Sequence, residues 1–322
     1  MFGVDNNTAK KEGVTIIKLV KLININSRID IKVLSHTEKG MNNKVYSAGI
    51  NRPGLSLTGF TKYFAYRRIQ LLGRGEIAYL EKLDAEDSYH LCNDFFAHNV
   101  PCCVVSYNMK APEKFKELCE HHNIPILSSS LSSSRLVNLL IKLLDDIFAP
   151  TIILHGTLIE IYGVGILLQG KSGVGKSEAA LELIERGNRL IADDLVKVKR
   201  MDFDILRGEG GDIIKHHMEI RGIGIIDIQK LYGVSAIKTS MNIDLIIYLE
   251  EWDTSKEYDR LGLDEHTSTI LDIKVPYLLI PVKPGRNIPV IIETAARNHR
   301  LKDMGYNSAS EFNKKLIELI SK

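Results

Sequence analysis

Several features are scarce in this chain of 322 residues, and each scarcity excludes a class of protein. No run of eighteen apolar residues occurs, so no transmembrane helix is expected. The segment 1–21 has only short apolar stretches broken by lysines, unlike a secretory signal peptide. The formal net charge is only +2, whereas nucleic-acid-binding proteins usually carry a clustered basic excess. We therefore expect a soluble globular protein that binds neither membranes nor nucleic acid.

Cysteine is also scarce, with only Cys92, Cys102, Cys103 and Cys119 in the whole chain. No two of them have C-x-x-C spacing, so we expect reduced thiols and a cytoplasmic location. The hydrophobic content of 44% and the charged content of 25% are typical of a globular protein. The length is sufficient for two domains of ordinary size.

What the chain does contain is a glycine-rich motif, Gly170-Lys171-Ser172-Gly173-Val174-Gly175-Lys176-Ser177, between an apolar run and a helical pattern. The spacing G-x-x-x-x-G-K-S is that of a phosphate loop with its required strand before and helix after. Such a loop points backbone N–H groups at an anion, and the helix N-terminus adds positive charge. We expect Lys176 to reach the β- and γ-phosphates of ATP and Ser177 to bind Mg²⁺. All eight residues are predicted to bind the nucleotide.

Composition suggests where the chain divides. Six serines occur in the seven residues 128–134, and so polar a segment predicts a flexible joint. We place the domain boundary there, with domains at 1–131 and 132–322. In the first, apolar segments at 100–106 and 124–127 flank a predicted helix that begins at Pro112, which indicates a small α/β domain. The predicted fold is therefore α/β, with this small domain followed by a phosphate-loop nucleotide-binding domain. His121-His122 ends the predicted helix and is expected to be solvated surface.

Two adjacent acids follow the predicted strand 189–192. A strand, the phosphate loop, a helix and a second strand form a β-α-β unit whose strands are expected to be parallel. Asp193 and Asp194 would then lie beside the phosphate loop, at the edge where ligands of open sheets bind. Because neighbouring side chains point to opposite sides of a strand, one could face the nucleotide and the other the scaffold. A carboxylate here can hold Mg²⁺ or accept a proton from an attacking hydroxyl.

Further charged residues interrupt apolar runs downstream. Glu219, in the segment 218–227, is a candidate second Mg²⁺ ligand, although a surface ion pair is equally compatible with the spacing. Glu250 ends an apolar strand and is a weaker candidate for the same role. Arg260 precedes a glycine and is of the residue type that stabilises a transferring phosphoryl group. The loop 281–287 is basic and bounded by proline and glycine, so it could hold free phosphate, although solvated surface charge is the common alternative.

Together these segments resemble one family, the HPr kinase/phosphorylases. The resemblance is carried by the segments 170–178, 186–194, 219–226, 258–262 and 281–287, and by Arg52-Pro53-Gly54-Leu55 in the first domain. It covers nearly the whole chain after the first dozen residues. The run Glu219-Ile220-Arg221-Gly222 joined to this phosphate loop is more specific than the loop alone.

The resemblance implies a kinase that regulates bacterial sugar uptake. Such enzymes phosphorylate a serine of HPr, the phosphocarrier of the sugar phosphotransferase system, with ATP or pyrophosphate and Mg²⁺. They also remove this phosphate by phosphorolysis, in which inorganic phosphate is converted to pyrophosphate. The family assembles as a homo-hexamer through its phosphate-loop domain, so we expect the same here.

Residue roles also follow from the resemblance. It implies that Ser177 and Glu219 bind Mg²⁺, and that Asp194 is the base that takes the serine proton and returns it in the reverse reaction. The implied catalytic residues are His155, Lys176, Asp194 and Arg260. The implied dephosphorylation loop is Pro281, Val282, Lys283, Pro284, Gly285 and Arg286. His155 rests on the resemblance alone, because a lone histidine is more often structural.

Two other readings compete. An ordinary nucleotide-hydrolysing switch is one, but the Asn-Lys-x-Asp segment that usually reads guanine is absent. The other is a nucleotide-binding regulatory protein without phosphotransfer to HPr. Every charged residue that the phosphotransfer mechanism needs is present, which argues against it.

Overall fold

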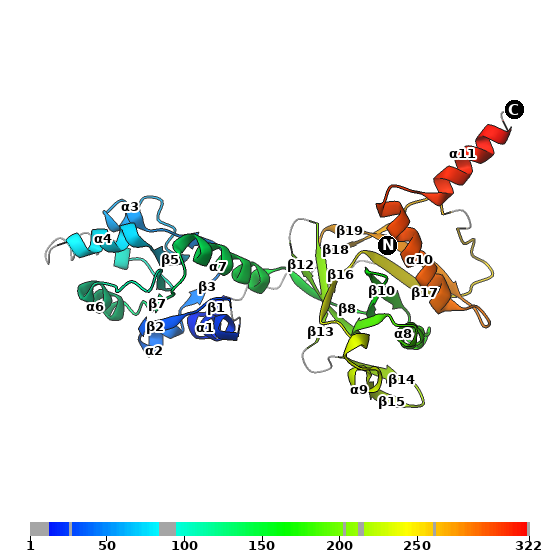
Figure 1. The fold of residues 1–322 in the computed structure, drawn as a ribbon, viewed down its shortest axis with the longest axis horizontal. Helices are drawn as coiled ribbons and strands as arrows, with labels where there is room; N and C mark the ends of the chain where they lie inside the picture. Colours follow the sequence, from blue (N-terminus) through cyan, green and yellow to red (C-terminus); the bar gives the residue numbers. More distant parts are fainter. Residues whose placement is uncertain are drawn as a thin grey trace. The chain divides into compact units, whose positions relative to one another are not determined.

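The computed structural model describes residues 13–25, 28–83, 95–201, 204–211, 216–259 and 262–320. The chain divides into two compact units, Met1–Phe148 and Ala149–Lys322 (Figure 1). Both units mix helices with strands, as the expected α/β class requires. Arg260 and Cys92 lie outside the described residues. No helix in the described ranges is long and apolar enough to cross a membrane.

The first unit is built on a five-stranded sheet in the order β2-β7-β6-β5-β4. These strands are β2 (Lys32–Ser35), β7 (Ile126–Ser128), β6 (Cys103–Val105), β5 (Ile69–Leu72) and β4 (Ile50–Asn51). β4 to β7 are parallel neighbours, and β2 pairs antiparallel with β7. The predicted strand–helix–strand is confirmed as β6, α6 (Glu113–His121) and β7.

Helices cover both faces of this sheet. One core contains side chains of α4 (Arg74–Lys82) and α6, together with Phe95 and Phe96. The opposite core contains side chains of α1 (Ile16–Ile25) and α7 (Ser133–Phe148). The small elements of this unit are β1 (Val14–Thr15), β3 (Lys44–Val45), α2 (Glu38–Met41) and α3 (Gly54–Leu57).

The predicted domain boundary at 131/132 is wrong, because the serine-rich segment is built into the first unit. Ser128 ends β7, and the Ser129 hydroxyl donates to Asp30 Oδ1 at 2.9 Å. The helix α7 begins within the segment and packs its buried stripe, Leu136, Leu140 and Leu144, into the core of the first unit. Burial of this apolar stripe outweighs the flexibility that a serine-rich composition suggests. The units therefore meet in sequence after Phe148.

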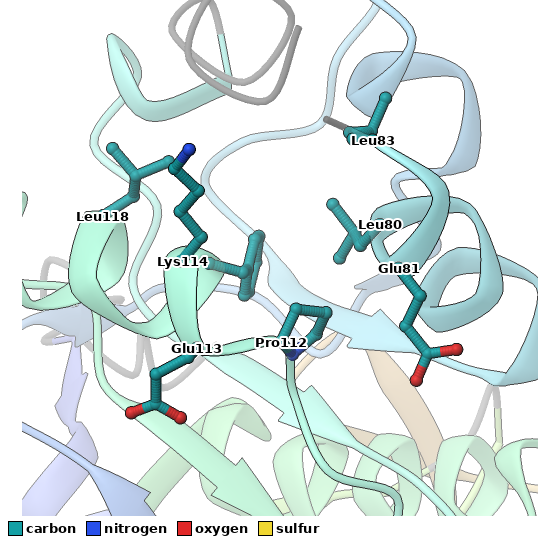
Figure 2. Close-up of a pocket in the computed structure, with 8 residues that line it drawn as sticks. Leu80, Glu81, Leu83, Pro112, Glu113, Lys114 and Leu118 are labelled. Carbon is teal, nitrogen blue, oxygen red and sulfur yellow. The ribbon is translucent and has the colours of Figure 1, made fainter. Parts of the chain in front are cut away.

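A small pocket of about 260 Å³ opens between α4 and α6 of the first unit. Figure 2 shows Leu80 and Leu83 on one side and Pro112 and Leu118 on the other. The carboxylates of Glu81 and Glu113 point away from these apolar side chains. All the candidate catalytic residues belong to the second unit, so this pocket is not part of the expected active site.

The second unit contains a six-stranded sheet in the order β11-β9-β10-β17-β19-β18. These strands are β11 (Arg189–Ala192), β9 (Thr157–Ile161), β10 (Val164–Gly170), β17 (Leu245–Glu251), β19 (Ile273–Val282) and β18 (Thr267–Ile270). β10, β17 and β19 are parallel neighbours. β9 is antiparallel to both β10 and β11, so β10 and β11 run in the same direction, as predicted, with β9 between them.

The two faces of this sheet bury different partners. One face packs against α8 (Lys176–Glu185) and α10 (Ile288–Asp303). The other packs against a four-stranded sheet in the order β16-β13-β12-β8. Its strands are β16 (Ser240–Asn242), β13 (Leu206–Gly210), β12 (Leu195–Arg200) and β8 (Thr151–His155). Alternation along β10 explains the division, because Ile166 and Leu168 enter the first core and Leu167 the second.

The remaining elements lie around these layers. A hairpin of β14 (His217–Ile220) and β15 (Gly224–Asp227) leads into α9 (Ile228–Tyr232) and a short 3₁₀ helix, Val234–Ala236. The hairpin and α9 lie close to α8 (Figure 1). The final helix α11 (Ser308–Ile320) has no buried side chain.

Candidate active site

The glycine-rich loop joins the end of β10 to the start of α8. Gly170 has a φ of +149°, and a Cβ added to it would lie 2.4 Å from the Leu249 carbonyl oxygen. Gly173 and Gly175 have φ values of +85° and +96°, in the left-handed region that glycine tolerates best. Gly175 is also the N-cap of α8. The glycine spacing thus has a steric cause at each position, which the sequence motif alone does not reveal.

Lys176 begins α8 and reaches back across the loop. Its Nζ donates to the carbonyl oxygens of Gly170 and Lys171, both at 3.1 Å. The ammonium group therefore lies over the loop backbone, next to the free N–H groups expected in the first turn of a helix. Positive charge from the side chain and from the helix terminus is concentrated at one place, which suits an anion.

Asp193 follows β11 and is buried, with 7% of the residue exposed. It accepts hydrogen bonds from Thr157 Oγ1, with 2.6 Å to Asp193 Oδ1, and from Ser177 Oγ, with 3.0 Å to Oδ2. Burial raises the pKa of Asp193 above that of an ordinary aspartate, although both hydroxyl donors act in the opposite direction. A carboxylate and a hydroxyl that meet beside the loop are the oxygen ligands that Mg²⁺ prefers.

Asp194 lies in a contrasting environment. Its side chain is 74% exposed, and its backbone adopts a φ of +65°. His155 Nδ1 is 3.6 Å from Asp194 Oδ1, and the backbone N–H of Gly156 donates to the Asp194 carbonyl at 3.0 Å. Because both side chains are exposed, this contact contributes little stability, and its importance is geometric. The adjacent acids thus face buried and exposed environments, and the histidine from the family resemblance lies beside the exposed one.

The β14–β15 hairpin contacts the glycine-rich loop through Arg221. Its Nη2 lies 3.4 Å from Ser172 Oγ, and a Cβ at Gly173 would come within 3.0 Å of Nη1. Glu219 is exposed on β14 and pairs across the hairpin with Ile225. No group of three His, Cys, Asp or Glu side chains within the described ranges is close enough to form a metal cluster.

Parallel pairing brings Glu250 to the same edge of the sheet. Gly170 on β10 pairs with Leu249 on β17, so Glu250 follows directly beside the start of the glycine-rich loop. Its Oε1 accepts from Lys256 Nζ at 2.7 Å, whereas Oε2 is buried with no partner among the described residues. The ion pair with Lys256 gives the Glu250 carboxylate a structural partner at the end of β17.

The segment 281–286 also starts at this edge, because Pro281 on β19 pairs with Glu250 on β17. Arg286 Nη1 donates to the Pro281 carbonyl at 2.7 Å and closes the turn. Lys283 Nζ lies 5.5 Å from the ring centroid of Trp252. Both cations are therefore held near the ends of parallel strands that also support the glycine-rich loop.

Sequence reasoning assigned no individual role to three residues that the structure places at the predicted site. Thr157 lies inside a strand, and nothing in its local pattern indicates the contact with Asp193. Arg221 belongs to the family motif 219–222, and its charge close to two glycines indicates a close approach of the backbone. Asp193 was weighed together with Asp194 but received no separate role. The predicted Arg260 lies outside the described residues, so the structure does not place it.

Comparison with known proteins matches both units. The family model of the HPr Serine kinase N terminus matches residues 14–144, and that of the HPr Serine kinase C-terminal domain matches residues 146–316. An HPr kinase/phosphorylase of Treponema pallidum (strain Nichols) is 54% identical over 282 residues, 87% of this chain and 88% of the relative. One from Alkaliphilus metalliredigens is 45% identical over 307 residues, 95% of this chain and 97% of the relative.

Among solved structures, the HPr(Ser) kinase/phosphatase from Coxiella burnetii is 38% identical to this chain. The match covers 50% of this chain and 98% of that one, with a TM-score of 0.45. The family models account for both units, and the relatives are similar over most of their length. The chain belongs to the HPr kinase/phosphorylase family.

Proposed function

We propose that this protein transfers a phosphoryl group from ATP or pyrophosphate to a serine of HPr and removes it by phosphorolysis with inorganic phosphate. The names of its relatives support this substrate and both reactions. The observation that carries the proposal is the position of Asp194. Its exposed carboxylate follows directly after Asp193, which binds Ser177 at the start of α8. A carboxylate accessible to a protein substrate therefore lies next to the predicted phosphate site.

The phosphate chain is proposed to bind the residues 170–177. The backbone of this loop supplies N–H groups, and α8 adds its positive terminus. The Lys176 ammonium can exchange its two carbonyl partners, those of Gly170 and Lys171, for phosphate oxygens. Bonds from the ammonium to charged phosphate oxygens are stronger than the bonds to neutral carbonyl oxygens that they replace.

Mg²⁺ is proposed to bind at Ser177 with Glu219, and the position of Asp193 adds a further oxygen donor. The Ser177 hydroxyl already lies 3.0 Å from Asp193 Oδ2, so one cation could contact both directly or through water. When bound, Mg²⁺ neutralises charge on the phosphates. Burial of Asp193 and its bond from Thr157 hold the carboxylate in one orientation.

Proton transfer is assigned to Asp194. In the forward direction its carboxylate accepts the proton of the HPr serine hydroxyl, and in the reverse direction the protonated acid returns it. His155, with Nδ1 3.6 Å from Asp194 Oδ1, can hold the carboxylate toward the substrate. One group thereby serves both directions, as microscopic reversibility requires.

The segment 281–286 is proposed to bind the inorganic phosphate of the reverse reaction. Arg286 is fixed by its bond to the Pro281 carbonyl, and a preorganised guanidinium suits a tetrahedral anion. Arg260 is proposed to stabilise the transferring phosphoryl group, a role that rests on the family resemblance.

We further propose a homo-hexamer assembled through the second unit, and a cytoplasmic location. The hexamer follows from the family resemblance, and the exposed apolar face of α11 is compatible with burial between subunits. Cys102, Cys103 and Cys119 are buried free thiols, which suits a reducing compartment.

The test uses purified protein, Mg²⁺, labelled ATP and HPr, followed by excess inorganic phosphate. Label should move to one serine of HPr, and pyrophosphate should then appear as the phosphoserine disappears. If ATP binds but HPr stays unlabelled, the phosphate site stands and the substrate is wrong. Such a result would favour a regulatory nucleotide-binding protein instead.

A further inference from the structure

A large open pocket lies on the first unit, on which none of the proposed catalytic roles depends. Its cavity volume is about 1210 Å³, above the range of about 300–1,000 Å³ usual for small-molecule sites. Its lining residues come from four segments. These are the region of α2 and β3, residues 66–67 before β5, residues 96–101, and the end of α6. Four segments far apart in sequence thus converge on one hollow.

Positive charge dominates the lining. Lys39, Lys44 and Arg67 all face the pocket and are exposed. None of the described residues that line it is acidic. Cations that gather around a concavity without carboxylates raise the local concentration of anions. Arg67 also lies 5.6 Å from the ring centroid of Tyr66, so its guanidinium is positioned against an aromatic face.

Aromatic rings form a second component of the lining. His122 stacks on the buried Phe96 with 5.2 Å between centroids and an interplanar angle of 16°. Tyr66 lies 4.9 Å from His98, and Tyr46 is 51% exposed at the same pocket. Burial, and then the neighbouring His121, hold the pKa of His122 below its ordinary value, which favours the uncharged ring. His121 is exposed, as expected at a solvated helix end, whereas His122 is half-buried with its ring flat against Phe96.

Side-chain amides complete the lining. Asn43 donates through Nδ2 to the carbonyl oxygens of Asn123 at 2.8 Å and Pro101 at 3.2 Å. These two bonds fix the orientation of the amide and join three of the segments that form the pocket. Amides can pair with the edge of a heterocycle, rings can stack on its face, and cations can bind an attached phosphate.

We propose that this pocket is a second nucleotide site, which binds an aromatic base bearing a phosphate group independently of the glycine-rich loop. A sugar phosphate would use the cations and leave the rings unused. A neutral aromatic molecule would leave the three cations without a partner. The nucleotide is the small-molecule class that uses all three components.

The test is made on the full-length Lys176→Ala variant, so that binding at the glycine-rich loop is suppressed. AMP, GMP, CMP and UMP are titrated by calorimetry with a metal chelator present. At least one should bind with one site per chain, and at least about tenfold more tightly than ribose 5-phosphate. Equal binding of ribose 5-phosphate, or no binding by any of the four, overturns the proposal.

Two further variants locate the site. Lys44→Ala with Arg67→Ala should weaken the tightest nucleotide at least about tenfold, because two phosphate partners are lost. Lys18→Ala with Lys21→Ala removes the same charge from the exposed side of α1 and should leave binding unchanged. Equal loss in both variants would mean non-specific charge attraction and overturn the proposal.

A second measurement covers the possibility that Lys176→Ala does not fold. The wild-type chain is photolabelled with 8-azido-AMP and digested. Labelled peptides from 39–46, 66–67, 95–101 or 122–123 support the proposal. Label confined to the second unit overturns it. The HPr phosphotransfer assay does not depend on this pocket. A failure of the second-site proposal would therefore leave the proposed function standing, and the reverse is also true.

Discussion

At the residue scale, two adjacent aspartates have different properties because their surroundings differ. Asp193 is buried beneath two hydroxyl donors, whereas Asp194 is exposed beside His155. The sequence predicted that one acid would face the ligand and the other the scaffold. It could not say which, because that depends on Thr157 in β9 and on the left-handed backbone of Asp194.

The first prediction concerns the pH dependence that Asp193 confers. Its pKa in the folded protein is raised above the unfolded value, so its stabilising contribution is present at low pH and lost as pH rises through the folded pKa. The asparagine of Asp193→Asn cannot ionise, so the variant does not lose this stability as pH rises. Relative to wild type, the variant should therefore gain stability as pH rises above the unfolded value of about 4. Urea unfolding across this range measures the difference, and a gap that does not change with pH would contradict the assignment.

At the element scale, the start of α4 is held by a buried carboxylate. Glu76 accepts from the backbone N–H of Gly73 at 3.0 Å and from Arg52 Nη2 at 2.9 Å. Burial acts to raise the pKa of Glu76, but the bonds from Arg52 and the backbone outweigh it and lower the pKa. The family segment Arg52-Pro53-Gly54-Leu55 thus has a structural use, which is to join α3 to the first turn of α4.

The second prediction has the opposite sign to the first. Because the pKa of Glu76 is lowered, its contribution is present above the unfolded value of about 4.5 and lost as pH falls through the folded value. Glu76→Gln should lower the free energy of unfolding by about 1–3 kcal/mol at neutral pH, since bonds to a charged group are lost. The loss should shrink below about pH 4. An equal loss of stability at neutral pH and below about pH 4 would show that the loss comes from altered packing instead.

A third prediction concerns the turn after β19. Arg286→Ala removes both the guanidinium and its bond to the Pro281 carbonyl. If this turn binds inorganic phosphate, phosphorolysis should slow by at least about tenfold more than phosphorylation. Parallel assays of the two rates provide the measurement. Equal losses would show that the turn supports the active site generally.

Periodic elements were the part of the fold that sequence could predict. The glycine-rich loop between β10 and α8, the direction of β11 and the β6–α6–β7 unit all follow from hydrophobic pattern and turn chemistry. The insertion of β9 between β10 and β11 did not follow, because strand order depends on long-range pairing. The serine-rich segment was misread for a related reason. Its serines form specific bonds with Asp30 and Ser106, which are far away in sequence.

At the scale of the whole molecule, each unit has its own pair of cores and its own proposed binding chemistry. The second unit matches the HPr Serine kinase C-terminal domain and holds the proposed phosphotransfer residues, and the first holds the basic aromatic pocket. α11 exposes Phe312, Leu316, Ile317, Leu319 and Ile320. An apolar helix face of this kind is commonly covered by another chain.

The fourth prediction is therefore assembly. Light scattering after size exclusion should give six times the 36.2 kDa mass of the chain. Leu316→Glu with Ile320→Glu should reduce the mass if α11 lies at the subunit interface. Lys314→Glu alters the same helix at a charged position and serves as the control. A wild-type monomer would contradict the hexamer.

The central claim is that one exposed carboxylate moves the proton in both directions, and Asp194→Asn tests it most directly. Phosphorylation of HPr and phosphorolysis of phosphoserine-HPr are measured with the same preparation, alongside calorimetry with MgATP. Asp272→Asn is the matched control, because Asp272 is 83% exposed and has a φ of +66°. We predict loss of both reactions in Asp194→Asn, with MgATP binding retained and the control fully active. Retention of either reaction would contradict the account.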